Sequence, residues 1–163
     1  MEFENFDGVH EKTLVLIKPD AVQRGKIGEV IHRLEKKGLK IIGLKFMELN
    51  EEILRDLYSH HVDKDFYPEL EKFMMSSPVV AMCVEGQNAI SSVRLITGDT
   101  HAGEAEAGTI RGDLAMGVCN VVHCSDSIEN AKKEIDRFFD KDDLYDYDKT
   151  EYRHVYMEEE LSK

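Results

Sequence analysis

The architecture of this chain is built around one segment, which reads Asn120-Val121-Val122-His123-Cys124-Ser125-Asp126-Ser127. A β-branched run ends at a histidine, a turn of small residues follows, and a new helix then begins. This pattern places His123 where a strand gives way to a helix, with its imidazole directed at a surface cleft. A histidine in such a place is a candidate nucleophile or general base, although a lone histidine is also compatible with a purely structural role.

Length and composition limit the classes of protein that the chain can be. It has 163 residues, 42% of them apolar, which predicts one domain over residues 1–163 with no need for disulfides or structural metals. Its apolar runs are too short to cross a bilayer, and its acidic beginning does not have the pattern of a signal peptide. A net charge of −12 argues against strong binding to nucleic acid or anionic membranes. Three cysteines without metal-binding spacing predict reduced thiols and a cytoplasmic location.

The first half of the chain alternates between strand and helix patterns. Residues 13–17 and 39–47 are apolar runs that predict two strands. Between them, apolar residues recur at helical spacing over residues 27–34. Asn50 and Pro68 are each placed to begin a further helix, so a pair of helices is predicted after the second strand.

The second half repeats the alternation around a long loop. Residues 79–84 predict a continuous apolar strand, and residues 89–96 predict a helix that Gly98 ends. Residues 99–117 are polar, rich in glycine and alanine, and without periodicity. A loop of that length in a compact domain is usually functional or disordered.

After the loop, residues 118–122 predict a strand and the stripe from Ile128 to Phe138 predicts a helix. Asp126 and Glu129 have the spacing of a capping box at its start. The tail from residue 141 is charged and aromatic, which predicts an extended segment held against the surface.

The order of these elements predicts an α+β fold. It fits a ferredoxin-like split βαβ sandwich, in which helices pack on one face of a four-stranded antiparallel sheet. A doubly wound fold would need more strands than the pattern contains.

Scattered cations indicate phosphate chemistry. Lys18 ends the first strand, Arg94 lies near the end of a helix, and Arg111 lies in the long loop. Each alone is compatible with a solvated surface charge, but together they can clamp a polyanion. There is no P-loop, and the adjacent His60 and His61 cannot face one metal ion from the same side of a helix. Glu134 is placed to accept one imidazole N–H of His123 and to leave the other nitrogen unprotonated.

With these residues assembled, the chain resembles the nucleoside diphosphate kinase family. The segment from Asn120 to Ser127 resembles the family motif N-x-x-H-G-S-D-S, and the resemblance covers a core of roughly residues 12–157. Three further stretches match in the right order, at residues 17–25, 78–82 and 108–113. Four motifs in sequence make a chance match improbable.

The resemblance implies Mg²⁺-dependent transfer of the terminal phosphate of a nucleoside triphosphate to a nucleoside diphosphate, with a phosphohistidine at His123. It implies that Ser125 and Glu134 orient the histidine, and that the long loop joins subunits of a homo-oligomer, either a hexamer or a tetramer. Mg²⁺ would be held mainly by the nucleotide phosphates, with no metal site on the protein. Residues that match positions binding phosphate, sugar or base are Lys18, Tyr58, Phe66, Leu70, Arg94, Thr100, Arg111 and Asn120.

Two positions depart from the family pattern. The segment 113–119 is one residue short, and Cys124 stands where the motif has glycine. The Cys124 thiol is expected near the phosphate site, where cations would lower its pKa and make it reactive. If this position needs a positive φ, a cysteine is strained there. The competing interpretation is therefore a nucleotide-binding oligomer of the same fold with reduced or lost catalysis.

Overall fold

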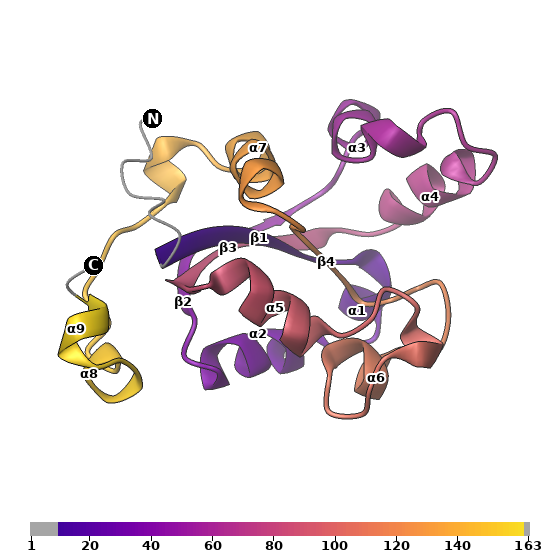
Figure 1. Cartoon of the computed structure of the whole chain (residues 1–163). Helices are drawn as coiled ribbons and strands as arrows, with labels where there is room; N and C mark the ends of the chain where they lie inside the picture. Colours follow the sequence, from indigo (N-terminus) through magenta and orange to yellow (C-terminus); the bar gives the residue numbers. More distant parts are fainter. Residues whose placement is uncertain (1–9, 162–163) are drawn as a thin grey trace.

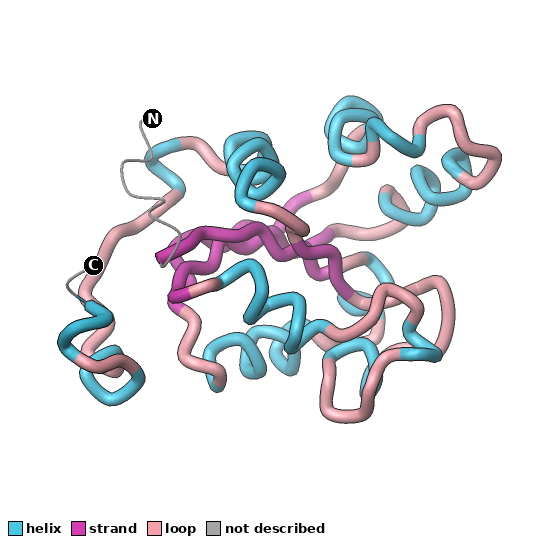
Figure 2. The backbone as a smooth tube through the Cα atoms, viewed as in Figure 1, coloured by secondary structure: helices cyan, strands magenta, loops and turns pink. Residues whose placement is uncertain are grey.

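The computed structural model describes residues 10–161 and is built on one four-stranded antiparallel sheet (Figures 1 and 2). The strands lie in the order β2-β3-β1-β4, as a split βαβ arrangement requires. Their bounds are β1 His10–Ile17, β2 Lys40–Met47, β3 Val79–Gln87 and β4 Val122–Cys124. The predicted α+β class and the antiparallel sheet are confirmed.

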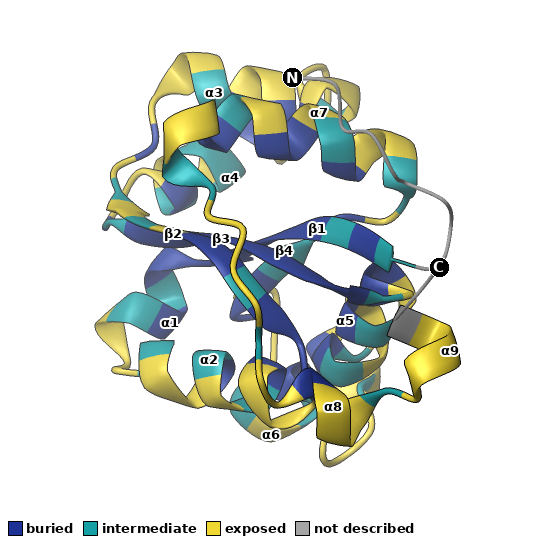
Figure 3. Cartoon of the chain, turned by 90° about the vertical axis from the view of Figure 1, so that its left-hand side faces the viewer, coloured by how far each residue is buried: buried dark blue, intermediate teal, exposed yellow. Residues whose placement is uncertain are grey.

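Helices cover both faces of this sheet, so the prediction of helices on one face was wrong (Figure 3). One core contains Val15 and Ile17, and the other contains Leu14 and Leu16. Successive side chains of a strand point to opposite faces, and both sets of positions are apolar over residues 14–17 of β1 and 79–84 of β3. A strand that is apolar at every position is buried on both faces, and the continuous run in β3 already carried that signal.

Each face has its own set of helices. The Val15 face is covered by α2 (Ile27–Lys36) and α5 (Ala89–Thr97), with α1 (Pro19–Gln23) and α6 (Ile110–Leu114) beside them (Figure 3). The Leu14 face is covered by α3 (Glu51–Leu57), α4 (Tyr67–Met74) and α7 (Ile128–Phe138).

Local signals placed most helix ends correctly. The Asn50 side chain accepts a hydrogen bond from the backbone N–H of Ile53, so it caps α3 as predicted. Gly98 follows α5 with a φ of +85°, a conformation that favours glycine. The predicted capping box was wrong, because Ser127 caps α7 by accepting from the backbone N–H of Asn130.

The last strand and the long loop differ from the predictions. β4 begins at Val122, four residues later than the predicted strand, and the apolar Val118 is 98% exposed. The loop is also not structureless, because it contains the short helix α6 and a 3-10 turn over Ala102–Glu104. Thr109 caps α6 by accepting from the backbone N–H of Gly112.

The C-terminal tail is only partly extended. It holds a 3-10 turn at Lys141–Asp143 and the short helices α8 (Tyr152–Val155) and α9 (Glu158–Leu161). Between the 3-10 turn and α8 the chain runs along the edge of the sheet (Figure 3). There the backbone N–H of Tyr145 donates to the carbonyl of Ile42 at 2.8 Å.

Candidate active site

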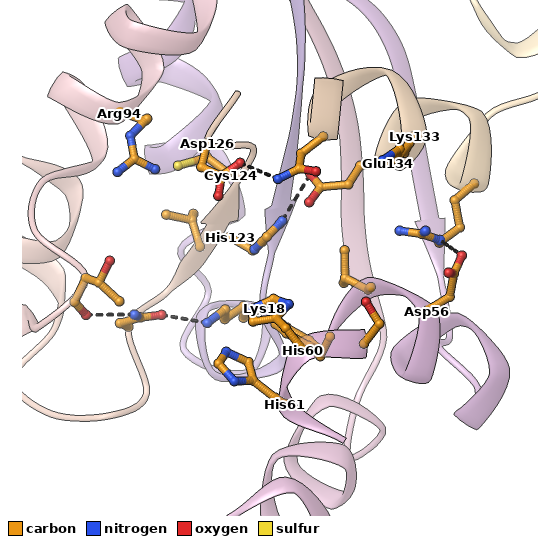
Figure 4. Close-up of a pocket in the computed structure, with 18 of the residues that line it drawn as sticks. Lys18, Asp56, His60, His61, Arg94, His123, Cys124, Asp126, Lys133 and Glu134 are labelled. Atoms are coloured by element: carbon orange, nitrogen blue, oxygen red, sulfur yellow. Dashed lines mark hydrogen bonds and ion pairs between the residues drawn. The ribbon is translucent and has the colours of Figure 1, made fainter. Parts of the chain in front are cut away.

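A cavity of about 550 Å³ opens where the end of β1, strand β4 and helices α3, α5 and α7 converge (Figure 4). Most of the residues predicted for the site line this cavity, namely Lys18, Tyr58, Arg94, Thr100, Arg111, Asn120, His123 and Glu134. The structure therefore brings together side chains that are more than 100 positions apart in sequence, such as Lys18 and Asn120.

His123 is held by a chain of hydrogen bonds that starts in the sheet. Its Nε2 lies 3.2 Å from Oε2 of Glu134, and that same oxygen accepts from the hydroxyl of Ser125 at 2.6 Å. The Ser125 hydroxyl in turn accepts from the backbone N–H of Leu14 at 3.3 Å. Ser125 does not line the cavity; it acts on the histidine through Glu134.

This geometry fixes the tautomer of the imidazole. An ionised carboxylate only accepts hydrogen bonds, so the Nε2 that faces Glu134 carries the proton. Nδ1 is then left with a free lone pair. A neutral imidazole with one nitrogen free is able to act as a nucleophile.

Two buried cations lie beside the histidine. The ammonium of Lys18 donates to Oδ1 of Asn120 at 2.7 Å, and the amide of Asn120 donates to the carbonyl of Thr100 at 2.9 Å. The guanidinium of Arg111 donates to three backbone carbonyls, those of Gly98, Asn120 and Val122. An arginine has five N–H groups, so two remain for a ligand.

Both cations lack a carboxylate partner in the described part of the chain, and their pKa values reflect this. Burial, with the nearby charge of Arg111, lowers the pKa of Lys18 to about 8. Burial also lowers the pKa of Arg111. An unpaired buried cation is costly, so the site favours an anion that supplies the missing charge.

Two polar groups in the cavity have no hydrogen-bond partner among residues 10–161. They are the buried hydroxyl of Tyr58 and the buried Nδ1 of His61. The Tyr58 ring lies edge-on to the ring of His123, with centroids 6.0 Å apart. His61 was not predicted, because its place in the cavity depends on how the α3–α4 connection folds. From the sequence, the adjacent His60 and His61 indicated only that they cannot bind one metal ion together.

The aromatic residue predicted to stack on the base lies just outside the cavity. Phe66 is 50% exposed and its ring meets that of His61 with centroids 5.2 Å apart. Leu70 does not line the cavity either; it is partly buried against the core beneath α4. Three further residues of α7 that line the cavity beside Glu134 were not predicted, namely Asn130, Lys133 and Arg137.

Cys124 behaves differently from the prediction. Its thiol does line the cavity, but burial raises the pKa of that thiol and outweighs the lowering effect of Arg111. The backbone at Cys124 is not strained, because it pairs with Val15 in the sheet and its φ is not positive. The residue with a positive φ in this segment is Val121, at +73°.

The described residues offer no metal centre of their own, since no group of three or more His, Cys, Asp or Glu side chains is placed to hold an ion. Among the carboxylates of the cavity, Glu134 is engaged by His123 and Ser125, and Asp56 forms an ion pair with Arg137. Among residues 10–161, no helix has the length and apolar content that a membrane span requires.

An imidazole with a free nitrogen among buried cations defines a site for phosphoryl transfer, and comparison with known proteins agrees. The family model for nucleoside diphosphate kinase matches residues 11–144. A nucleoside diphosphate kinase of Staphylococcus saprophyticus is 48% identical over 147 residues, which cover 90% of this chain and 99% of that protein. The chain belongs to the nucleoside diphosphate kinase family.

Solved structures agree in fold. A halophilic nucleoside diphosphate kinase from Halobacterium salinarum, in complex with CDP, is 45% identical with a TM-score of 0.88, covering 90% of this chain and 99% of that one. A nucleoside-diphosphate kinase from Borrelia burgdorferi, with bound vanadate and ADP as a transition state mimic, is 31% identical with a TM-score of 0.84. That match covers 90% of this chain and 96% of the other.

Proposed function

We propose that this chain transfers the terminal phosphate of a nucleoside triphosphate to a nucleoside diphosphate, with His123 carrying the phosphate between the two substrates. The single observation that carries this proposal is the contact between Nε2 of His123 and Glu134, which leaves Nδ1 free inside a cationic cavity. The bound molecules of the Halobacterium and Borrelia proteins, CDP and ADP, support nucleotides as the ligands.

Two half-reactions account for the transfer. In the first, the Nδ1 lone pair attacks the terminal phosphorus, an N–P bond forms, and the P–O bond to the departing diphosphate breaks. Positive charge develops on the ring as this happens, and Glu134 stabilises it through the Nε2 proton. In the second, a terminal oxygen of another diphosphate attacks the phosphorus, the N–P bond breaks, and its electron pair returns to Nδ1.

The cations position the phosphates and neutralise their charge. Lys18 keeps two ammonium protons free, Arg111 keeps two N–H groups free, and Arg94 makes no ion pair within the described residues. The hydroxyl of Tyr58 and Nδ1 of His61 can each complete a hydrogen bond with a phosphate oxygen. Phosphoryl transfer depends mainly on such alignment and charge neutralisation.

Mg²⁺ fits this site as a companion of the nucleotide and not as a protein-bound ion. The cavity carboxylates are engaged, while its free donors suit phosphate oxygens that also hold a metal. When bound, the ion neutralises charge on the transferred phosphate. Chelation by EDTA is therefore expected to stop turnover without changing the melting temperature, whereas a drop in melting temperature would indicate a structural metal.

Recognition of the base is expected to be broad. Phe66 offers an exposed ring that contacts His61, a residue of the cavity wall, and Leu70 lies one helical turn further on. Stacking on a ring accepts any base, because every base has an aromatic face. Turnover with purine and pyrimidine diphosphates should differ little, and Phe66→Ala should raise KM for all of them.

The proposal includes a homo-oligomer, hexameric or tetrameric, and a cytoplasmic location. Met116 and Val118, on the loop that precedes β4, are more than 90% exposed, which supports burial of this loop against another subunit. All three cysteines are free thiols, as a reducing compartment would maintain them. Light scattering of the purified protein, compared with a Met116→Ser/Val118→Ser variant, tests the assembly.

Labelling tests the nucleophile. With ATP labelled at its γ-phosphate and Mg²⁺, His123 should acquire label in a bond that is acid-labile and stable to alkali. His123→Ala should lose labelling and turnover together, while still binding nucleotide. A variant that binds nucleotide but labels elsewhere would exclude His123 as the carrier, and wild-type protein that binds without labelling would favour a binding protein.

A further inference from the structure

Val121 has a backbone conformation that its side chain disfavours. Its φ is +73°, and among residues 10–161 only one other non-glycine residue, Asn88, has a positive φ. A β-branched residue is rarely found in this left-handed region, because the branched side chain crowds the backbone. Such a conformation persists only where the surrounding contacts hold it.

Three residues hold Val121 in place. The carboxylate of Asp20 accepts from the backbone N–H of Val121 at 3.1 Å, and the backbone N–H of Lys18 donates to its carbonyl at 2.8 Å. Arg111 donates to the carbonyls on either side, those of Asn120 and Val122. Both backbone polar groups of Val121 are therefore bonded to the segment that follows β1.

The carboxylate of Asp20 has no other hydrogen-bonding task that the structure reveals. Its Oδ2 bonds to the Val121 N–H, while its Oδ1 is buried without a hydrogen-bond partner in the described chain. Asp20 does not line the cavity, so it is not placed to touch a substrate. The Asp20 carboxylate, whose one hydrogen bond goes to the N–H of Val121, is therefore suited to fix the backbone of Val121.

The bend at Val121 separates two residues that must face the cavity. Asn120, just before it, positions the ammonium of Lys18, and His123, two residues after it, pairs with Leu16 in the sheet. If Val121 were extended, the strand would continue through it and successive side chains would point to opposite sides. The side chain of Asn120 would then point in a different direction from the one it has now.

We propose that Asp20 is a positioning residue for phosphoryl transfer, whose carboxylate holds Val121 in the left-handed conformation and thereby sets the relation between Asn120 and His123. The inference rests on the proposed role of His123. Asp20 also lies in the first turn of α1, where an acidic residue favours a helix N-terminus. The two roles of Asp20 can be told apart, because a variant that relieves the strain at Val121 should rescue the loss of the backbone contact but not the loss of a favourable charge at the helix N-terminus.

The test compares Asp20→Ala, Asp20→Asn and Asp20→Ala/Val121→Gly at pH 6.5, which lies below the pKa of about 8 of Lys18 in the unaltered protein. Asp20→Ala loses the hydrogen bond to the Val121 N–H, which should lower kcat by about tenfold to a hundredfold with little change in KM. A loss of this size is expected for a small displacement of reacting groups. The asparagine variant should keep most of kcat, because its amide oxygen can accept the same N–H. Glycine adopts a positive φ without strain, so Val121→Gly should restore much of the kcat lost in Asp20→Ala.

Circular dichroism confirms that each variant is folded before kcat is measured, because Val121→Gly also removes a fully buried side chain. Glu29→Ala is the matched control, since Glu29 is the acidic residue in the first turn of α2 and should leave kcat unchanged. The proposal is overturned if Asp20→Ala keeps full kcat, if Asp20→Asn is as slow as Asp20→Ala, or if glycine at position 121 restores nothing. Failure of the proposed function has a separate sign, which is continued turnover in His123→Ala.

Discussion

Two lysines are buried at opposite ends of the sheet, and they differ in their partners. Lys18, 9% exposed, bonds to the neutral amide of Asn120 and lies near Arg111. Lys40, 4% exposed, lies 3.2 Å from a carboxylate oxygen of Glu85 and 3.2 Å from one of Asp146.

Their pKa values move in opposite directions. Burial and the charge of Arg111 lower the pKa of Lys18 to about 8. Burial acts on Lys40 as well, but the charges of Glu85 and Asp146 outweigh it and raise its pKa. A buried lysine that the fold has paired cannot be removed without leaving its carboxylate unpaired, whereas a buried lysine without a carboxylate is available to an anionic ligand.

The largest expected effect is on stability at the paired end. Lys40→Met should lower the free energy of unfolding by roughly 3–5 kcal/mol, because it leaves the buried carboxylate of Glu85 short of a partner. Urea denaturation measures this, and kcat should stay unchanged. Lys40→Met/Glu85→Leu should recover most of the loss; a double variant as unstable as the single one would contradict the pairing.

The next effect is acid sensitivity at the same end. Burial alone would raise the pKa of Glu85, but the hydrogen bond from His10 and the charge of Lys40 lower it to about 2. A depressed carboxyl pKa stabilises the protein above the unfolded value of 4.5, and the stabilisation is lost as the pH falls toward 2. It should amount to roughly 2–3 kcal/mol. Denaturation of Glu85→Gln should show a flatter dependence between pH 4.5 and 2.

At the other end, Lys18→Met should damage activity and not stability. Loss of one charge-assisted contact should cost roughly 1.5–3 kcal/mol of transition-state binding, or about 10- to 150-fold in kcat/KM. Removal of an unpaired buried charge should leave the urea midpoint unchanged or raise it. Equal losses of stability in Lys18→Met and Lys40→Met would remove the distinction between the two ends.

The smallest effect is an alkaline limb in the pH profile. Lys18, which faces Arg111, Asp20, Cys119 and Cys124, is charged below about pH 8 and neutral above it. The value of kcat/KM should therefore fall by up to about tenfold per pH unit above pH 8. Lys18→Arg keeps its charge at these pH values, so its profile should stay flat; a persisting limb would assign the titration to another group.

The sequence was sufficient where the signal is local. The caps at Asn50 and Gly98 were predicted because each depends on a few neighbouring residues. The start of β4 was not, because Val118 belongs to an apolar run but is exposed in the structure. The left-handed Val121 could not be predicted either, since its conformation depends on Asp20, about 100 positions away.

The candidate site was predicted partly from the placement of individual residues and partly from the resemblance to family motifs. The positions of His123, of the cations and of Glu134 were already informative, and the motifs added Tyr58, Thr100 and Asn120, but neither predicted the hydrogen bond that connects Leu14 to Ser125. They also gave no indication of His61, whose unpartnered nitrogen is recognisable only in three dimensions. Local sequence signals were enough to predict most helices and strands. Which polar atoms remain without a partner depends on tertiary contacts, which the sequence alone did not reveal.

The contacts of Arg111 also bear on how this chain tolerates changes in length. Because its guanidinium bonds to the carbonyls of Asn120 and Val122, the segment 112–119 forms a loop whose two ends are joined by one side chain. The entropy of closing a loop changes slowly with its length. The length of that segment can therefore change by a residue while Asn120 and Val122, and with them His123, keep their positions beside Arg111.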